Sequence, residues 1–324
     1  MITIKEIAIA ADVSIATVSR VINFPDLVSS DTLKRVQKTI EKMGYAPNKI
    51  ARSLKSQASM TVGLITSDIT NPFLVKVIKG AEKTLFSAGY TPIICDSEEN
   101  IKKEDRYLRD LTERRIDGLI IIPVLERLEA PSLIKNVPTV FVDRSLSSEC
   151  DCVKSNNFTG ISLLIHDLYR KGHRNIAFIG GPEHSLVGNE RYDAFRKISR
   201  ELGLAVNPDF MIKSDFTVSG GYSAARGLLG QKARPDSIIA ANNLMGIGIL
   251  KSLRDMKNAD TEKIEIATFD ELGELVGARY TYIRQPALEM GAQAGKMLLD
   301  RMQGGNDLPP RLLQFEPVLM FNDY

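Results

Sequence analysis

One short segment combines an arginine with small and hydroxyl-bearing side chains, a set that can read the major groove of DNA. Arg20 can donate two hydrogen bonds to the O6 and N7 atoms of a guanine. The side chains of Ile15 and Ala16 can contact thymine methyl groups, and the hydroxyls of Thr17 and Ser19 can reach phosphate oxygens. An ordinary helical hairpin, whose hydroxyls only cap and solvate its helices, is the alternative interpretation.

Two short helices joined by a tight turn would present these side chains. Apolar residues recur at helical spacing on both sides of the turn, at Ile4, Ile7, Ala8 and Ala11 before it and at Val18, Val21 and Ile22 after it. Asp12 and Ser14 are candidate N-caps of the second helix, because their side-chain oxygens can accept from its unpaired N–H groups. A third helix is predicted to start within residues 28–32 and to run to Met43, where Gly44 ends it.

Basic residues concentrate in the amino-terminal part of the chain. Residues 1–60 hold nine Lys and Arg against five Asp and Glu, whereas the remainder holds 33 against 35. Between Lys34 and Lys55 there are seven basic residues, and only Glu41 opposes them. This excess favours a surface that binds phosphates over a charged face that is merely solvated.

From Met60 onward, apolar β-rich runs alternate with amphipathic helices, which is the rhythm of a parallel sheet. Strands are predicted at 61–66, 92–95, 118–122 and 139–142, then, after a restart at Ser155, at 176–179, 237–241, 264–269 and 281–283, with a last strand over 312–321. The restart indicates two similar doubly wound α/β halves. Open sheets of this kind bind ligands at the carboxyl ends of their strands.

Polar and aromatic side chains follow these strand ends. They are Asn71, Phe73, Asp143, Arg144, Phe216, Asn242, Asp270 and Gln285, with Asp68 and Asp215 beside them. Each of them alone could cap a helix or belong to the core. Their joint position at successive strand ends is harder to explain by capping and predicts a ligand site between the halves.

The first sixty residues resemble the DNA-binding headpiece and hinge of the LacI-type (LacI/GalR) family of bacterial repressors. The resemblance rests on T-I-K-E-I-A at 3–8, V-S-I-A-T-V-S-R-V-I-N at 13–23 and Y-A-P-N-K-I-A-R-S-L at 45–54. Residues 60–324 are similar to the effector domain of that family, which itself is similar to periplasmic sugar-binding proteins. This second resemblance rests on R-I-D-G-L-I at 115–120, K-G-H-R-N-I at 171–176, G-G-P at 180–182, Arg191, T-F-D at 268–270 and I-R-Q-P at 283–286.

The resemblance implies a helix-turn-helix headpiece over residues 1–47, a hinge over 48–59 and an effector-binding and dimerisation domain over 60–324. The residues that it assigns to DNA are Thr3, Ser14, Ile15, Ala16, Thr17, Ser19, Arg20, Asn23, Ser29, Tyr45, Asn48, Ala51, Leu54 and Lys55. In the family, the hinge becomes helical when two protomers meet over the operator, and a leucine matching Leu54 wedges into the minor groove. A plain interdomain linker is the alternative for this segment.

The match to the family's sugar binders implies a carbohydrate effector. It covers Asn71, Phe73, Asp143, Arg144, Arg191, Phe216, Asn242, Asp270 and Gln285. Carboxylates, amides and guanidinium groups at this density suit the hydroxyls of a polyol, and the two phenylalanines could cover a sugar ring. Leu74 replaces an aromatic residue that some relatives carry. Two arginines facing two aspartates leave both a neutral sugar and a sugar acid open, and a purine- or nucleoside-responsive repressor of the same fold is the alternative.

The predicted fold class is α/β: an all-α helix-turn-helix headpiece, then a periplasmic-binding-protein-like effector domain of two doubly wound parallel-sheet subdomains. We expect a sequence-specific DNA-binding regulator, a repressor in its simplest form, whose affinity for a near-palindromic operator is controlled by a sugar or sugar acid. Without a leucine heptad after the last strand, a homodimer is expected.

No enzyme activity, cofactor or metal site is expected. The three cysteines, Cys95, Cys150 and Cys152, and the three histidines lack the spacing of a metal site, and no nucleophile, base and oxyanion arrangement is evident. The chain shows no run of about 18 apolar residues and no secretory signal, so we expect a cytoplasmic protein without a membrane partner.

Overall fold

The computed structural model describes residues 2–45, 58–125, 131–144, 150–256, 263–273, 277–304 and 309–323. The chain divides into two units, Met1–Ser59 and Met60–Tyr324. Four residues predicted to act in the hinge, Asn48, Ala51, Leu54 and Lys55, lie outside the described ranges. Within those ranges, no helix has the length and apolar character needed to cross a membrane.

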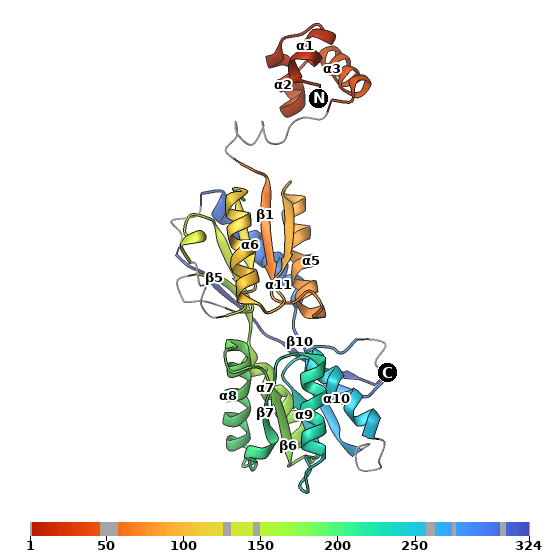
Figure 1. Ribbon diagram of the computed structural model, residues 1–324, viewed down its shortest axis with the longest axis vertical. Helices are drawn as coiled ribbons and strands as arrows, with labels where there is room; N and C mark the ends of the chain where they lie inside the picture. The colour runs from red at the N-terminus through yellow and green to blue at the C-terminus, as the bar shows by residue number, and fades with distance from the viewer. Residues whose placement is uncertain are drawn as a thin grey trace. The chain divides into compact units, whose positions relative to one another are not determined.

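Three helices build the described part of the amino-terminal unit, residues 2–45, as predicted. They are α1 (Ile4–Ala10), α2 (Ile15–Asn23) and α3 (Ser30–Met43), with a short 3-10 turn, η1 (Pro25–Leu27), before α3 (Figure 1). Ile7, Ala8, Ala11, Val18, Val21 and Val36 form its buried core. Ser14 caps α2 by accepting a hydrogen bond from the Thr17 N–H at 3.1 Å, whereas Asp12 instead takes a left-handed turn conformation with φ +50°. Gly44 ends α3 at φ +61°, a conformation that favours glycine.

A six-stranded parallel sheet forms the first half of the second unit. Its strands are β1 (Thr61–Thr66), β2 (Thr91–Asp96), β3 (Gly118–Ile121), β4 (Thr139–Val142), β5 (Asp151–Ser155) and β11 (Leu312–Phe315), in the order β11-β5-β4-β3-β1-β2. Helices α5 (Pro72–Ser87) and α11 (Ala287–Met302) pack on one face, and α6 (Ile101–Glu113) packs on the other. A 3-10 turn, η2 (Pro131–Leu133), precedes β4.

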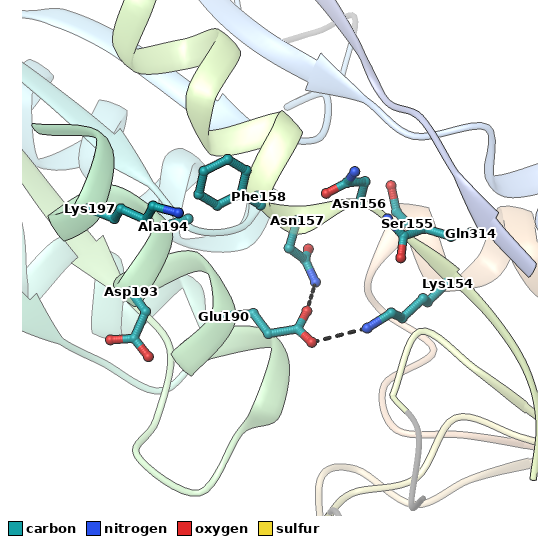
Figure 2. A pocket seen from close by; sticks show the side chains of 10 residues that line it. All are labelled: Lys154, Ser155, Asn156, Asn157, Phe158, Glu190, Asp193, Ala194, Lys197 and Gln314. Carbon is teal, nitrogen blue, oxygen red and sulfur yellow. Dashed lines mark hydrogen bonds and ion pairs between the residues drawn. The ribbon is translucent and has the colours of Figure 1, made fainter. Parts of the chain in front are cut away.

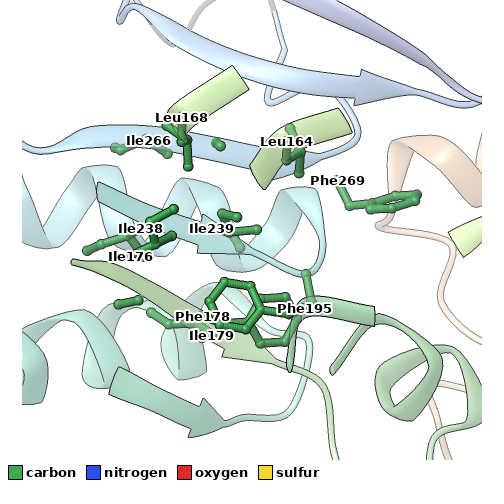
Figure 3. Close-up of a cluster of buried hydrophobic side chains, with 14 of the residues drawn as sticks. Leu164, Leu168, Ile176, Phe178, Ile179, Phe195, Ile238, Ile239, Ile266 and Phe269 are labelled. Carbon is green, nitrogen blue, oxygen red and sulfur yellow. The ribbon is translucent and has the colours of Figure 1, made fainter. Parts of the chain in front are cut away.

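The second half repeats this plan around another six-stranded sheet. Its strands are β6 (Ile176–Gly180), β7 (Met211–Lys213), β8 (Ser237–Ala240), β9 (Glu265–Phe269), β10 (Tyr280–Arg284) and β12 (Val318–Asn322), in the order β12-β10-β9-β8-β6-β7 with β12 antiparallel. Helix α7 (Asn157–Arg170) packs on α8 (Leu186–Glu201), and α9 (Val218–Leu229) packs on α10 (Asn243–Met256). The turn η3 (Pro208–Phe210) leads into β7. Figure 3 shows the apolar core that these helices bury against the sheet.

One strand prediction was wrong, and one strand was missed. The expected single strand over 312–321 is two strands, β11 and β12, which belong to different sheets. Pro317 has no N–H to continue the ladder, and the chain leaves the first sheet at this point. Strand β5 was not predicted, because its sequence begins with a charged residue, Asp151. That carboxylate is only 4 % exposed and pairs with Arg301 and Arg311 at 2.8 and 2.9 Å.

Candidate functional site

A cavity of about 70 Å³ lies between the two halves, at the carboxyl ends of their strands. The first half contributes Asp68, Asn71, Phe73, Leu74, Glu99, Asp143 and Arg144, and the second contributes Val187, Arg191, Asp215, Phe216, Thr217, Asn242 and Asp270. All of the predicted effector residues except Gln285 are among them. The alternation of strands and helices therefore brings together side chains that lie as far apart in sequence as Asn71 and Asp270.

Two aspartates take equivalent positions at the two sheets. Asp143 follows β4 and Asp270 follows β9, and both have left-handed backbones, with φ +65° and +71°. This conformation is unfavourable for a side chain larger than hydrogen and concentrates at functional sites. Burial raises the pKa of Asp270 to about 7, against the opposing effect of Arg191. Burial likewise raises the pKa of Asp143.

Gln285 forms a hydrogen bond with Asp270 and is not among the residues that line the cavity. Its Nε2 donates a hydrogen bond to Asp270 Oδ2 at 2.8 Å, and its side chain is buried. Its role in contacting a ligand therefore stays a prediction. Gln285 lies outside the lining because it follows β10, whose carboxyl end stands one strand further from the cavity than that of β9.

Arg191 is held in place on three sides. Its Nε donates to Asn157 Oδ1 at 2.8 Å, its Nη1 donates to the Ala241 carbonyl, and its guanidinium lies 3.6 Å from the centroid of the Phe269 ring. Stacking of this kind fixes the plane of the guanidinium. Arg191 is 3 % exposed, and its charge interacts with Asp143 and Asp270. It presents a preset donor group to the cavity.

Arg144, which was predicted to contact the ligand, forms hydrogen bonds with the protein. Its Nη1 donates to Glu99 Oε2 at 2.9 Å and its Nη2 donates to Glu99 Oε1 at 2.7 Å. Nη1 also donates to the carbonyl oxygens of Pro123 and Val124. Both terminal nitrogens of Arg144 are therefore engaged by the protein itself, whereas its buried Nε has no hydrogen-bond partner among the described residues. Glu99 was not among the predicted site residues.

The two asparagines cap helices and line the cavity at the same time. Asn71 Oδ1 accepts from the Phe73 N–H at 3.0 Å at the start of α5, and it also accepts from Asn243 Nδ2 of the other half at 3.4 Å. Asn242 Oδ1 accepts from the Met245 N–H at 2.9 Å, and its Nδ2 donates to the carbonyl of Phe216. Each of the two asparagines therefore caps a helix and also lines the cavity.

The aromatic residues of the cavity differ in how they are held. Phe73 is 6 % exposed and belongs to the core beneath α5. Phe216 has a left-handed backbone with φ +64° and packs over Gly181. A Cβ atom at position 181 would lie 2.1 Å from the Phe216 ring, so a larger residue there would displace the ring. This close approach explains why the Gly-Gly-Pro segment precedes the cavity.

A chain of contacts leads from Arg191 away from the cavity. Asn157, which accepts from Arg191, donates through Nδ2 to Glu190 Oε2 at 2.6 Å, and Glu190 Oε1 accepts from Lys154 at 3.1 Å (Figure 2). Lys154 belongs to β5 of the first half, whereas Glu190 belongs to α8 of the second. A second cavity of about 420 Å³ adjoins these residues and shares no lining residue with the first. Sequence reasoning missed both Asn157, which begins α7 just after the unpredicted strand β5, and Glu190, which lies on α8 beside Arg191.

The amino-terminal unit exposes much of the predicted DNA-reading set. Ile15 is 47 % exposed, and Ala16 and Arg20 are also exposed on α2. Thr17 and Ser19 are partly exposed. The side chains of Val18 and Val21 point into the core, which leaves this face of α2 outward. The arrangement is that of a recognition helix.

Other predicted DNA contacts already have partners within the unit. Thr3 Oγ1 donates to Glu6 Oε2 at 2.9 Å and caps α1, and Ser14 shares a 2.9 Å hydroxyl contact with Thr17. Ser29 Oγ donates to Thr32 Oγ1 at 3.0 Å at the start of α3, and Tyr45 packs partly against the core. The side chain of Asn23 lies outside the description.

No group of three or more His, Cys, Asp or Glu side chains that could hold a metal ion occurs among the described residues. The three histidines are placed apart from the cavity lining. His173 contacts Asp236 and Glu265 at 3.2 and 3.0 Å, His166 contacts Ser162 on its own helix, and His184 is exposed.

Comparison with known proteins shows the same two parts. Residues 3–48 match the family of bacterial regulatory proteins of the lacI type, and residues 59–313 match the periplasmic binding proteins and sugar-binding domain of the LacI family. The ribose operon repressor of Escherichia coli (strain K12) is 31 % identical over 326 residues, which cover 99 % of this chain and 98 % of that repressor. The HTH-type transcriptional repressor PurR of Photorhabdus laumondii subsp. laumondii is 33 % identical over 345 residues, covering 100 % and 99 %.

A solved structure of similar architecture is the complex of the transcriptional regulator CelR with cellobiose. It is 28 % identical, has a TM-score of 0.74, and the match covers 99 % of this chain and 98 % of that one. A helix-turn-helix unit followed by two doubly wound halves around a cavity defines a DNA-binding transcriptional regulator with an effector domain, not an enzyme. The chain belongs to the LacI family of bacterial regulatory proteins.

Proposed function

We propose that this protein is a cytoplasmic repressor whose affinity for its operator is set by a small polyhydroxylated molecule bound between the two halves of the effector domain. The observation that carries the proposal is the convergence of Asp143, Arg191 and Asp270 on one cavity. Three charged groups there face one another with Asn71 and Asn242 beside them. Adjacent hydroxyls of a sugar can pair with such donors and acceptors simultaneously.

The same cavity is less suited to a purine. A base needs flat apolar walls and an amide edge, whereas Phe73 is largely buried in the core and position 74 is a leucine. The relatives include the ribose repressor and PurR, so both classes belong in the test.

In the proposed mechanism, two protomers bind a near-palindromic operator through α2, and residues 48–59 form a hinge whose Leu54 enters the minor groove. Closure of the two halves on the effector alters the spacing of the residues that lead into this hinge. We take the sign to be induction, so that bound effector lowers operator affinity. By linkage, operator DNA then lowers effector affinity by the same factor.

The experiment is a thermal-shift panel on the full-length chain with pentoses, hexoses, disaccharides, sugar acids, sugar phosphates and purines. A ligand present at 100 times its Kd adds about 2.7 kcal/mol to the free energy of unfolding, so a true effector gives a clear shift. Stabilisation by a sugar is expected. Stabilisation by a purine alone, or by none of the compounds, would contradict the proposed effector class.

An arginine pair on α8 supplies a matched control for the site. Arg191→Met removes the guanidinium stacked on Phe269, and Arg196→Met removes an exposed guanidinium on the same helix. We expect the first variant to lose effector binding at least tenfold while retaining operator binding, and the second to behave as the parent. Equal effects of both variants would argue against a ligand at Arg191.

A further inference from the structure

Glu99 and Arg144 form a bidentate pair at the wall of the effector cavity. The two N–O distances are 2.7 and 2.9 Å, and the Arg144 side chain is only 8 % exposed. Parallel hydrogen bonds of this kind are strong and directional. Since the carbonyls of Pro123 and Val124 take the remaining side of Nη1, the guanidinium is turned toward the protein and its charge is balanced by Glu99.

The backbone that carries Glu99 is held in an unusual conformation. Glu98 and Glu99 have φ values of +52° and +51°, although neither is a glycine. The Glu99 N–H donates to the carbonyl of Ser67 at 2.7 Å, which attaches this turn to the end of β1. Two consecutive left-handed residues are costly, and such conformations concentrate at ligand sites. The turn places the Glu99 carboxylate within hydrogen-bond distance of Arg144.

The remaining charges of the cavity are predominantly negative. Among the described residues that line it, the acidic side chains are Asp68, Glu99, Asp143, Asp215 and Asp270, and the basic ones are Arg144 and Arg191. Glu99 balances Arg144, while Arg191 faces both Asp143 and Asp270. An anionic ligand that met Arg191 would also lie near the carboxyls of Asp143 and Asp270, and the charge of Arg144 is already balanced by Glu99. A buried charge without a partner of its own is strongly disfavoured.

We propose that Glu99 is the residue that sets the charge specificity of this cavity. By occupying Arg144, it makes the site one for uncharged polyhydroxylated ligands and excludes the corresponding sugar acids. This inference rests on the proposed function, since it places the effector in the same cavity. Removal of the Glu99 charge leaves the Arg144 guanidinium available to a ligand carboxylate and shifts the preference toward acids.

The test compares Glu99→Gln with Glu98→Gln. Glutamine at 99 keeps an oxygen that can accept from Arg144, so the turn is retained while the negative charge is lost. Glu98 has the same backbone conformation but pairs with Lys103 at 2.7 Å and is 70 % exposed, so its variant controls for changes in the turn. Calorimetry measures Kd for pairs that keep the pyranose ring and differ by the carboxylate at C6: glucose and glucuronate, galactose and galacturonate, mannose and mannuronate.

The parent and Glu98→Gln are expected to bind the neutral member of a pair at least tenfold more tightly than the acid. In Glu99→Gln, the ratio of acid to neutral Kd should fall at least tenfold, with less than a threefold change for the neutral sugar. An unchanged ratio in Glu99→Gln, or a parent that binds the acid as tightly as the neutral sugar, would overturn the proposal.

A second readout does not require the cognate sugar. Sorbitol and gluconate are acyclic polyols of equal length, and only gluconate carries a carboxylate. At matched ionic strength, gluconate should raise the melting temperature of Glu99→Gln above that of the sorbitol sample, but not those of the parent and Glu98→Gln. If no sugar binds the parent, the proposed function fails, yet this comparison still decides the role of Glu99. Equal responses of all three proteins would refute it.

Discussion

Buried acids dominate the chemistry of the effector cavity at the scale of single residues. Asp143 and Asp270 stand on left-handed backbones at equivalent strand ends, and burial raises the pKa of each. Arg191 opposes both effects because its guanidinium lies near both carboxyls. A ligand whose hydroxyl groups donate hydrogen bonds to these two carboxyls would replace the hydrogen bonds to water that burial removes.

The raised pKa of Asp270 predicts a pH-dependent contribution to stability. Because its pKa is about 7 in the folded chain and near 3.8 when unfolded, the folded state binds more protons between these values. The contribution of Asp270 to the free energy of unfolding is therefore highest at the acidic end and falls as the pH rises toward 7. The slope from one such group is at most about 1.4 kcal/mol per pH unit.

Asp270→Asn should remove this dependence. Urea denaturation at several pH values between 5 and 8 should show a less negative slope of unfolding free energy against pH, with the variant gaining most at pH 8. Asp209→Asn, at an exposed aspartate in η3, is the control and should keep the parental slope. If Asp270→Asn also kept it, the raised pKa would be refuted.

At the scale of elements, the Lys-Gly-His-Arg segment after α7 fastens that helix to the second sheet. His173 contacts Asp236 and Glu265 through its two ring nitrogens, and Lys171 pairs with Asp167 at 2.8 Å and with Glu265. Burial would raise the pKa of Asp236, but hydrogen bonds from the N–H groups of residues 174 and 175 hold it below its usual value. These contacts give the segment a structural role.

His173→Ala should destabilise the effector domain without affecting its ligand. Loss of both contacts leaves two carboxylates without this partner, which lowers the free energy of unfolding by about 1–3 kcal/mol. His184→Ala, at an exposed histidine, should change it by less than about 0.5 kcal/mol. Urea denaturation distinguishes the two variants, and equal stability of both would contradict the fastening role.

The contacts among Lys154, Glu190, Asn157 and Arg191 join the cavity to the point where the chain passes from one half to the other. Glu190→Ala frees Asn157 from its acceptor, so the orientation of Arg191 should loosen and effector affinity should fall about tenfold, or 1.4 kcal/mol. Calorimetry with the effector measures this change.

Glu183→Ala is the matched control for that variant. Glu183 also pairs with a lysine, Lys213 at 3.0 Å, but its side chain is 80 % exposed and does not contact Asn157 or Arg191 in the described structure. Its effector affinity should equal that of the parent. Parental affinity in Glu190→Ala as well would show that Arg191 does not depend on this set of contacts.

The sequence predicted which residues follow the strands better than it predicted which of those residues pair with one another. Asn71, Asp143 and Asp270 were predictable because each follows an apolar strand in an alternating pattern. The pairing of Arg144 with Glu99 was not, since the two lie 45 residues apart and only the register of the sheet brings them together. Strand β5 was not predicted, because the arginines that pair with its buried Asp151 come some 150 residues later in the sequence.

The two units must act together at the scale of the whole molecule, since one presents α2 and the other holds the effector cavity. The basic residues between Lys34 and Lys55 should make DNA binding strongly dependent on salt. For a dimer that contacts six to ten phosphates, the slope of log affinity against log salt should lie between about −5 and −9. Fluorescence anisotropy at several salt concentrations measures it, and a slope near zero would contradict the DNA-binding surface.

Leu54→Ala tests the hinge separately. If Leu54 enters the minor groove of the operator, its removal should weaken specific binding at least tenfold and leave nonspecific binding nearly unchanged, because nonspecific binding depends on phosphate contacts. Competition titrations against random duplex DNA separate the two affinities. Retained specific affinity would refute the insertion of Leu54 into the minor groove.

The central claim is that a sugar in the effector cavity controls binding to DNA. Its most direct test is the affinity of the full-length protein for an operator selected from random duplexes, measured by anisotropy with and without the sugar that stabilises the chain most. We predict at least a tenfold fall in operator affinity with that sugar, and no change in Arg191→Met. An operator affinity that no sugar alters, in a protein whose cavity binds one, would contradict it.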